Sequence, residues 1–168
     1  MTSKIHRLTL EMLAWEAGNP HRSQHLLKVH AFARAIALEE GLASELTGRI
    51  EAAALVHDIG IRPALEKYGS SAGPLQEAEG MEPARQLLTR MGFAPETVER
   101  IVFLVGHHHS YPAIDGIDFQ ILVEADFLVN LHEGSSSPEA CRQALETIFK
   151  TDAGSRLLCQ MFGLFGNS

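Results

Sequence analysis

The sequence predicts an all-α fold, a single-domain helical bundle, and three observations support this. Apolar residues recur every three or four positions through most of the chain, which is the period of one face of a helix. No pair of alternating segments flanks a short turn, as a β-hairpin requires. The 168 residues match one ordinary domain without repeats or low-complexity linkers. We therefore expect one domain over residues 1–168, with a core at about 20–135 and C-terminal helices at 137–165 packed on it.

Two helices are predicted in the first third of the chain. The segment HLLKVHAFARAIALEEG follows Pro20, and a proline is tolerated in a first helical turn. Its inward face carries His25, Val29, Phe32, Ala33, Ile36 and Ala37. A second helix is expected over residues 44–57, with Ser44 as its N-cap. Gly60 and Pro63 then break the helical pattern.

Two loops separate the helices of the middle of the chain. The stretch KYGSSAGP, residues 67–74, is predicted to be a loop, and the helical pattern returns over residues 75–91. Another helix is expected to begin at Pro95 and to run to the triple histidine. SYPAIDG, residues 110–116, is predicted to be a second loop.

The C-terminal third predicts three more helices. FQILVEADFLVNL, residues 119–131, is predicted to be a buried helix, although its β-branched content leaves a strand open. The next helix begins with Ser137 as N-cap and Pro138 in its first turn. A last helix over about 153–164 has an apolar face of Leu157, Leu158, Met161, Phe162 and Phe165. This face either covers the core or forms a subunit contact, which leaves a homo-oligomer open.

Composition narrows the class of partner. The net charge of −7 argues against a nucleic acid polymer, because such binding rests on clustered Lys and Arg. A small phosphorylated substrate stays compatible, because a metal ion supplies local positive charge. The two cysteines, Cys141 and Cys159, lack metal-site spacing and are expected to be free thiols. Residues 1–20 do not resemble a secretion signal, and no apolar stretch is long enough for a membrane span, so we expect a cytoplasmic protein without a membrane partner.

Some of the nine histidines stand where an apolar residue is expected. His25, His57 and the run 107–109 lie at or near the inward faces of predicted helices, whereas His6, His21 and His132 occupy polar or helix-end positions and are expected to be solvated. Burying an unpaired imidazole is costly, so several such residues together indicate that something compensates the burial.

Two aspartates extend this pattern. Asp58 follows His57 directly, and Asp126 lies within the apolar segment ILVEADFLV. A lone buried carboxylate has a raised pKa, whereas one bound to a divalent cation stays ionised. His25, His57, Asp58 and Asp126 together supply two imidazoles and two carboxylates. This donor set suits Mn, Fe, Ni, Co or Zn and leaves coordination positions for water and substrate.

Each of these residues also has a reading without a metal. His57 and Asp58 alone form an ordinary helix-end pair, and His25 alone is a satisfied core histidine. The run 107–109 at a helix end complements the negative end of the helix dipole. The metal-site interpretation therefore depends on all four donors occurring together.

The order His…His-Asp…Asp resembles the HD-domain superfamily of metal-dependent phosphohydrolases. HLLKVHAFA resembles the family's first motif helix, AALVHDIG its central motif, and LVEADFLVN the helix with the final Asp. The resemblance covers about residues 20–135 and implies an all-α bundle of the HD-domain type with one divalent metal, a second being open. It also implies hydrolysis of a small phosphorylated substrate, often a nucleotide, by metal-activated water. Asp58 is the implied catalytic residue, which binds the metal and holds the water.

The sequence departs from the family pattern at two places. Ile61 stands where many members have Lys, so Arg62 or Lys67 is the candidate phosphate contact. Gln76 stands where binuclear members have a histidine. Glu77 and Glu79 are nearby carboxylates that can substitute for that histidine.

The segment GHHHSYPAIDG resembles the paired histidines of the binuclear branch. We align His108 and His109 with that pair as ligands of a second metal or of phosphate, with His107 as the alternative if the register slips by one.

Two rival functions use the same scaffold. A di-iron oxygenase of this type requires a complete second ligand set, which Gln76 puts in doubt. A non-catalytic sensory or scaffold module usually loses ligands, whereas all four core positions are kept here.

Overall fold

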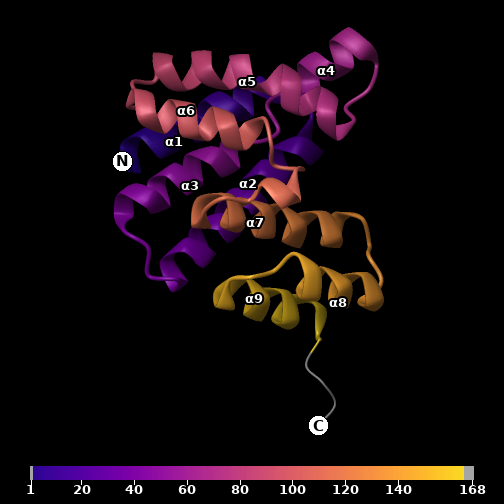
Figure 1. Ribbon diagram of the computed structural model, residues 1–168. Coiled ribbons are helices and arrows are strands. Elements are labelled where there is room, and N and C mark those ends of the chain that lie inside the picture. Colours follow the sequence, from indigo (N-terminus) through magenta and orange to yellow (C-terminus); the bar gives the residue numbers. More distant parts are fainter. Residues whose placement is uncertain (1, 165–168) are drawn as a thin grey trace.

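The computed structural model describes residues 2–164, and these residues form helices and no strand, so the all-α prediction is confirmed (Figure 1). The helices, in chain order, are α1 Thr2–Trp15, α2 Pro20–Glu39, α3 Ser44–Val56, α4 Ile61–Tyr68, α5 Gly73–Arg90, α6 Pro95–Val105, the 3-10 turn η1 Tyr111–Ala113, α7 Ile117–Glu133, α8 Pro138–Thr147 and α9 Asp152–Phe162.

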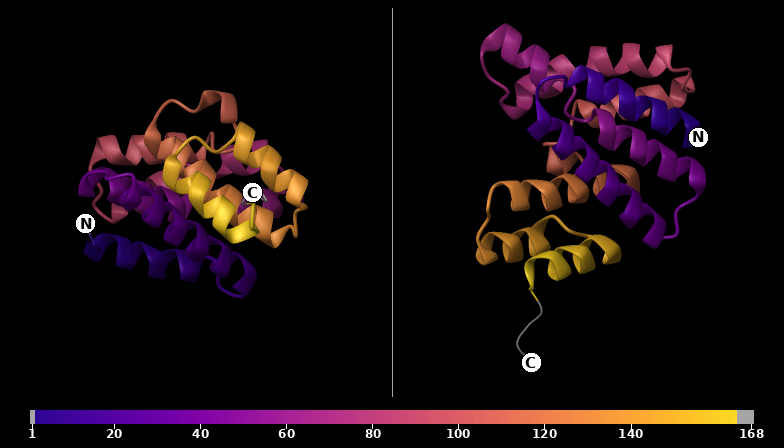
Figure 2. Two further views of the ribbon diagram at one scale, coloured as in Figure 1. Left: turned by 90° about the horizontal axis from the view of Figure 1, so that it is seen from below. Right: turned by 180° about the vertical axis from the view of Figure 1, so that it is seen from behind.

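Helices α2, α3 and α7 pack against one another at the centre of the bundle. The α5–α6 pair lies on one side of this centre with α4 at its end, and the α8–α9 pair lies on the other side (Figures 1 and 2). Large apolar side chains fill the space between the helices, and those fully buried include Leu8, Met12, Ile36, Ile50, Leu55, Leu88, Ile101, Leu104, Phe119, Ile121 and Leu122. Helices α2 and α7 and the turn after α3 carry the candidate metal donors, so the core also positions the site.

Two helices, α1 and α4, have no counterpart in the prediction. Helix α1 buries Ile5, Leu8 and Met12, which share one helix face. Helix α4 crosses Pro63, where the sequence predicted a break. Pro63 is the third residue of α4, and the first backbone N–H groups of a helix have no partner within it, so a proline is accommodated there. The break is confined to the turn at residues 57–60.

The structure also decides the predictions on two helix N-caps and on the buried segment 119–131. The Ser137 side chain accepts a hydrogen bond from the Ala140 N–H at 3.2 Å, as its predicted cap role requires. The prediction of Ser44 as an N-cap is wrong, because Ala43 is the cap residue and Ser44 begins α3. Residues 119–131 lie within α7, so the helix and not the strand is correct.

Two predictions concern the surface of the bundle. None of the described helices is both long and apolar enough to cross a membrane. On the apolar face of α9, Leu158 is buried and Met161 is exposed, while Phe165 lies outside the described residues.

Candidate metal centre

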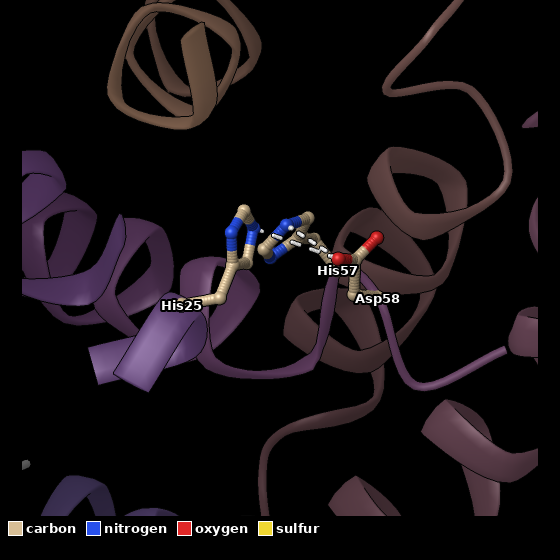
Figure 3. A group of neighbouring side chains, drawn as sticks. All are labelled: His25, His57 and Asp58. Atoms are coloured by element: carbon tan, nitrogen blue, oxygen red, sulfur yellow. Dashed lines mark ion pairs between the residues drawn. The ribbon is translucent and has the colours of Figure 1, made fainter. Parts of the chain in front are cut away.

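Three central helices bring the predicted donors to one place. His25 lies on α2, His57 and Asp58 directly follow the C-terminal end of α3, and Asp126 lies on α7. Figure 3 shows the His25 ring, the His57 ring and the Asp58 carboxylate turned toward one another. We call His25, His57, Asp58 and Asp126 the four-donor cluster.

The donor atoms of the four-donor cluster lie at nearly equal distances. The Nε2 atom of His25 is 3.2 Å from Asp126 Oδ1 and 3.6 Å from Asp58 Oδ2. The Nε2 atom of His57 is 3.5 Å from each of the same two oxygens. Donors bound to one metal at roughly 2.1 Å lie about 3.0 to 3.4 Å apart. The observed separations therefore fit one shared cation.

Hydrogen bonding orients the imidazoles for metal binding. His57 Nδ1 donates to the Ala54 carbonyl at 2.8 Å, and His25 Nδ1 lies 2.9 Å from Glu133 Oε2. A partner on Nδ1 fixes the tautomer that leaves Nε2 free to bind a metal, as in many metalloproteins. Both Nε2 atoms are buried and form no hydrogen bond within the described residues, and Asp126 Oδ1 is in the same condition. Buried polar atoms without partners are rare, so this convergence fits side chains that share one bound cation.

The charges of the cluster favour ionised carboxylates. Burial raises the pKa of Asp58, but His57, His108 and Arg22 outweigh it and hold the pKa well below its ordinary value. Burial lowers the pKa of His25, whereas Asp126, Asp58 and Glu133 raise it to about 9. Without a metal the site is therefore a set of imidazolium–carboxylate pairs, and metal binding must displace protons.

A second group of donors lies beside the first. Donor atoms of Glu77, His108 and His109 lie within 4.8 Å of one another. His108 repeats the arrangement of the two imidazoles above: its Nδ1 donates to the Val105 carbonyl at 2.9 Å, and its buried Nε2 has no partner among the described residues. That Nε2 is 3.5 Å from Asp58 Oδ1. Asp58 therefore faces His25 and His57 with its Oδ2 atom and His108 with its Oδ1 atom.

The histidine run has a definite register. His108 and His109 adjoin the site, as aligned from the sequence, whereas His107 stacks on Phe103 with ring centroids 4.3 Å apart and donates from Nδ1 to the Phe103 carbonyl. His107 is therefore not a site residue.

Gln76 lies at the position that the resemblance assigned to it. Its Nε2 is 3.2 Å from His109 Nε2, and its Oε1 is buried without a partner among the described residues. Of the two glutamates considered as substitutes, Glu77 accepts a hydrogen bond from the His109 N–H at 2.8 Å. Glu79 instead pairs on the surface with Lys67 at 2.7 Å. The second group therefore has a carboxamide where a third imidazole is expected.

The cation that the sequence reasoning missed is Arg22. Its Nη2 is 3.4 Å from Asp58 Oδ2, and its Nε donates to Glu16 Oε2 at 3.2 Å. Arg22 lies three residues before His25 on the same helix, which is a spacing that places both on one face and was readable from the sequence. Lys67 and Arg62 do not line the site pocket described next.

His25, Asp58 and Asp126 line a cavity of about 210 Å³, which we call the site pocket. Its walls are formed by His21, Arg22, His25, Asp58, Ile61, Ser71, Gln76, His109, Asp126, Asn130 and Glu133. The opening therefore exposes the donor cluster to a small ligand.

An all-α bundle that gathers a His, a His-Asp pair and an Asp around one pocket defines the class of HD-type domains. A family model described as "HD domain" matches residues 22–145. The chain therefore belongs to the HD-domain family.

A solved structure is also similar, namely the crystal structure of a predicted HD superfamily hydrolase from an uncultured Thermotogales bacterium. The TM-score is 0.66 at 23% sequence identity, over 96% of this chain and 85% of that chain. At this identity the likeness shows the HD-type fold. No curated protein matches the chain.

Proposed function

We propose that this protein is a metal-dependent phosphohydrolase that acts on a small phosphorylated substrate, a nucleotide or a related phosphoester. The observation that carries the proposal is the convergence of the His25 and His57 Nε2 atoms on the Asp58 and Asp126 carboxylates. Both Nε2 atoms and Asp126 Oδ1 are buried without a hydrogen-bond partner among the described residues. Family membership supports a hydrolase, and the site pocket has room for a phosphate group.

In this proposal the four-donor cluster holds one divalent metal, which is Mn, Fe, Ni, Co or Zn. When bound, such a metal supplies Lewis acidity, which lowers the pKa of a water molecule and polarises a phosphoryl oxygen. Glu133 holds the His25 ring in place through Nδ1, and the Ala54 carbonyl does the same for His57. These partners stabilise the tautomers that binding requires.

Asp58 is the proposed catalytic residue because its two oxygens face different sides of the pocket. Oδ2 lies with the donors of His25 and His57, whereas Oδ1 faces His108 at 3.5 Å. An oxygen in that second position accepts a hydrogen bond from the attacking water and orients it toward phosphorus.

Three further side chains are proposed to contact the phosphate. Arg22 lines the pocket beside Asp58 and supplies the positive charge that stabilises the phosphoryl oxygens. His108 and His109 bind either the phosphate or a second metal. The neighbouring Gln76 makes phosphate the better-supported ligand of His108 and His109, because a carboxamide binds such metals more weakly than the imidazole that a second metal site would need at this position.

The setting of the enzyme is also part of the proposal. Cys141 and Cys159 are both free thiols, which supports the reducing environment of the cytoplasm. We take residues 1–168 to act as one domain, since α8 packs on α9 and α9 contacts both α2 and α7.

The test combines metal analysis with a substrate screen. Protein purified without chelators is expected to contain a divalent transition metal and to release phosphate from nucleotides when Mn²⁺ is added, and EDTA should stop the release. Asp58→Ala should lose both metal and turnover, whereas Asp152→Ala, an exposed aspartate at the start of α9, should keep both. Metal content that is unchanged in Asp58→Ala would favour a scaffold module. Oxygen consumption with two irons per chain would favour the oxygenase.

A further inference from the structure

The site pocket is too small for most of a nucleotide. Its volume of about 210 Å³ lies below the roughly 300–1,000 Å³ that small-molecule sites usually have. A phosphate group fits, but the rest of a larger substrate must extend beyond the rim. The neighbouring surface therefore determines which substrates the site accepts.

A second cavity adjoins the site pocket and shares two of its wall residues, Arg22 and Ile61. Its volume is about 400 Å³. We call it the Trp15 cavity, and its walls are Trp15, Glu16, Ala17, Asn19, Arg22, Ile61, Arg62, Leu65 and Glu66. These residues come from the end of α1, the turn that follows it, the start of α2, and helix α4.

On one wall of the Trp15 cavity the guanidinium of Arg62 lies over the indole of Trp15. The Arg62 guanidinium lies 5.6 Å from the centre of the Trp15 ring, and its Nη1 donates to the Trp15 carbonyl at 3.2 Å. The indole Nε1 is buried and finds no acceptor within residues 2–164. Leu65, which is 47% exposed, and Ile61 add apolar surface to the same cavity.

The charges in the Trp15 cavity are already paired. Arg62 bonds Glu66 Oε1 at 3.0 Å, and Arg22 bonds Glu16 at 3.2 Å. A further phosphate group there would meet both carboxylates, so the cavity does not suit a second anion. It suits an uncharged planar group with polar edges, because aromatic and guanidinium faces stack on such groups.

We propose that the Trp15 cavity binds the heterocyclic base of a nucleoside monophosphate whose phosphate lies in the site pocket. This inference rests on the proposed function. Arg22 stands in the walls of both cavities, beside Asp58 on one side and Glu16 on the other. It is therefore the positioning residue that sets the phosphate at a fixed distance from the base.

Trp15 is the only tryptophan of the chain, so intrinsic fluorescence reports on the surroundings of this one residue, which lines the Trp15 cavity and also a cavity on its other side next to Gln86 and Arg90. The full-length protein, treated with EDTA to prevent turnover, is titrated with the four common nucleoside monophosphates, with nucleosides and with ribose 5-phosphate, under red-edge excitation. Base stacking should quench the fluorescence saturably with the nucleotides and more weakly with the nucleosides. Ribose 5-phosphate should leave it unchanged. Quenching no greater than that of free N-acetyltryptophanamide, or equal quenching by ribose 5-phosphate, overturns the proposal.

Variants give an independent test through kinetics. Trp15→Leu should raise KM for a nucleoside monophosphate roughly 5- to 150-fold, the range expected from loss of one stacked base. Its kinetics with glycerol phosphate, which has no base, should be unchanged, and Trp15→Phe should restore most of the nucleotide affinity. Leu10→Ala, at an exposed position on the same helix and outside both cavities, is the matched control. Equal loss with both substrates in a folded Trp15→Leu contradicts a base site.

The two proposals fail in different ways. If no phosphoester is hydrolysed but nucleotides still quench Trp15, the hydrolase assignment fails and the base site stands. If glycerol phosphate and nucleotides are hydrolysed with similar KM and Trp15 is silent, the base site fails and the hydrolase stands.

Discussion

The close approach of α4 and α5 makes Gly60 a sensitive position. A Cβ atom at Gly60 would lie 1.9 Å from the Gln76 carbonyl oxygen and 2.6 Å from the Gly80 nitrogen, whereas real Cβ contacts are essentially never below 3.0 Å. Both obstacles are backbone atoms, so no rotamer change relieves the clash. Gly60→Ala therefore requires the turn after Asp58 and helix α5 to separate by about 1 Å or more.

Gly60→Ala is expected to lower the free energy of unfolding by at least about 3 kcal/mol, which is the upper end of the usual cost of overpacking a core. For a chain of this size that lowers Tm by about 6–12 °C. Thermal and urea unfolding measure the loss, and metal affinity should fall as well because Asp58 lies on one of the two displaced segments.

Gly69→Ala is the control for Gly60→Ala. Gly69 has a φ of 66°, but a Cβ there meets no atom within 4 Å. It should therefore lose only the roughly 1–2 kcal/mol of a left-handed backbone. A Gly60→Ala protein as stable as the wild type, or more stable than Gly69→Ala, would refute the close-packing argument.

Three further outcomes follow from contacts around the site and the C-terminal helices. Glu133→Ala removes the Nδ1 partner of His25 and should weaken metal binding about 10- to 100-fold, measured by competition with a chelator; unchanged affinity would contradict its role. In metal-free protein the pKa of His25, followed by NMR, should be about 9. Because this folded-state pKa is raised, the stability that His25 contributes is complete below about pH 6.5 and is lost as the pH rises toward 9. A free energy of unfolding that stays constant over that pH window would count against the ion pairs. Gly154→Ala should destabilise the packing of α9 by about 1–3 kcal/mol or more in urea unfolding, because a Cβ there lies 2.0 Å from Oε2 of the fully buried Glu124; a neutral result would contradict that contact.

Helical periodicity was sufficient to predict most of the bundle. The predicted helices correspond to α2, α3 and α5 to α9, because each has a continuous apolar face and clear end signals. Helix α4 was missed because Pro63 was interpreted as a break, although a proline in the first turn is compatible with a helix. Helix α1 was missed because its first residues were weighed only as a targeting signal, while Ile5, Leu8 and Met12 already had helical spacing.

The donor residues of the site could be predicted from the sequence, but the contacts that Arg22 and the histidine run make there could not. Buried ionisable residues in apolar helices indicated the four-donor cluster, and the structure brings these residues together. The register of the histidine run was not predictable, because residues 106–109 form a turn after α6 and the helical period ends there. The role of Arg22 depends on contacts to Asp58 and Glu16, which are distant in sequence or unrelated by helical spacing.

The central claim is that side chains from α2, α7 and the turn after α3 enclose one cation. X-ray absorption spectroscopy of protein loaded with one equivalent of Mn²⁺ or Zn²⁺ tests it directly. The expected spectrum shows two imidazole ligands together with oxygen ligands, and His57→Ala should remove one of the imidazoles. An all-oxygen shell, or a spectrum that is identical in His57→Ala, would contradict the account.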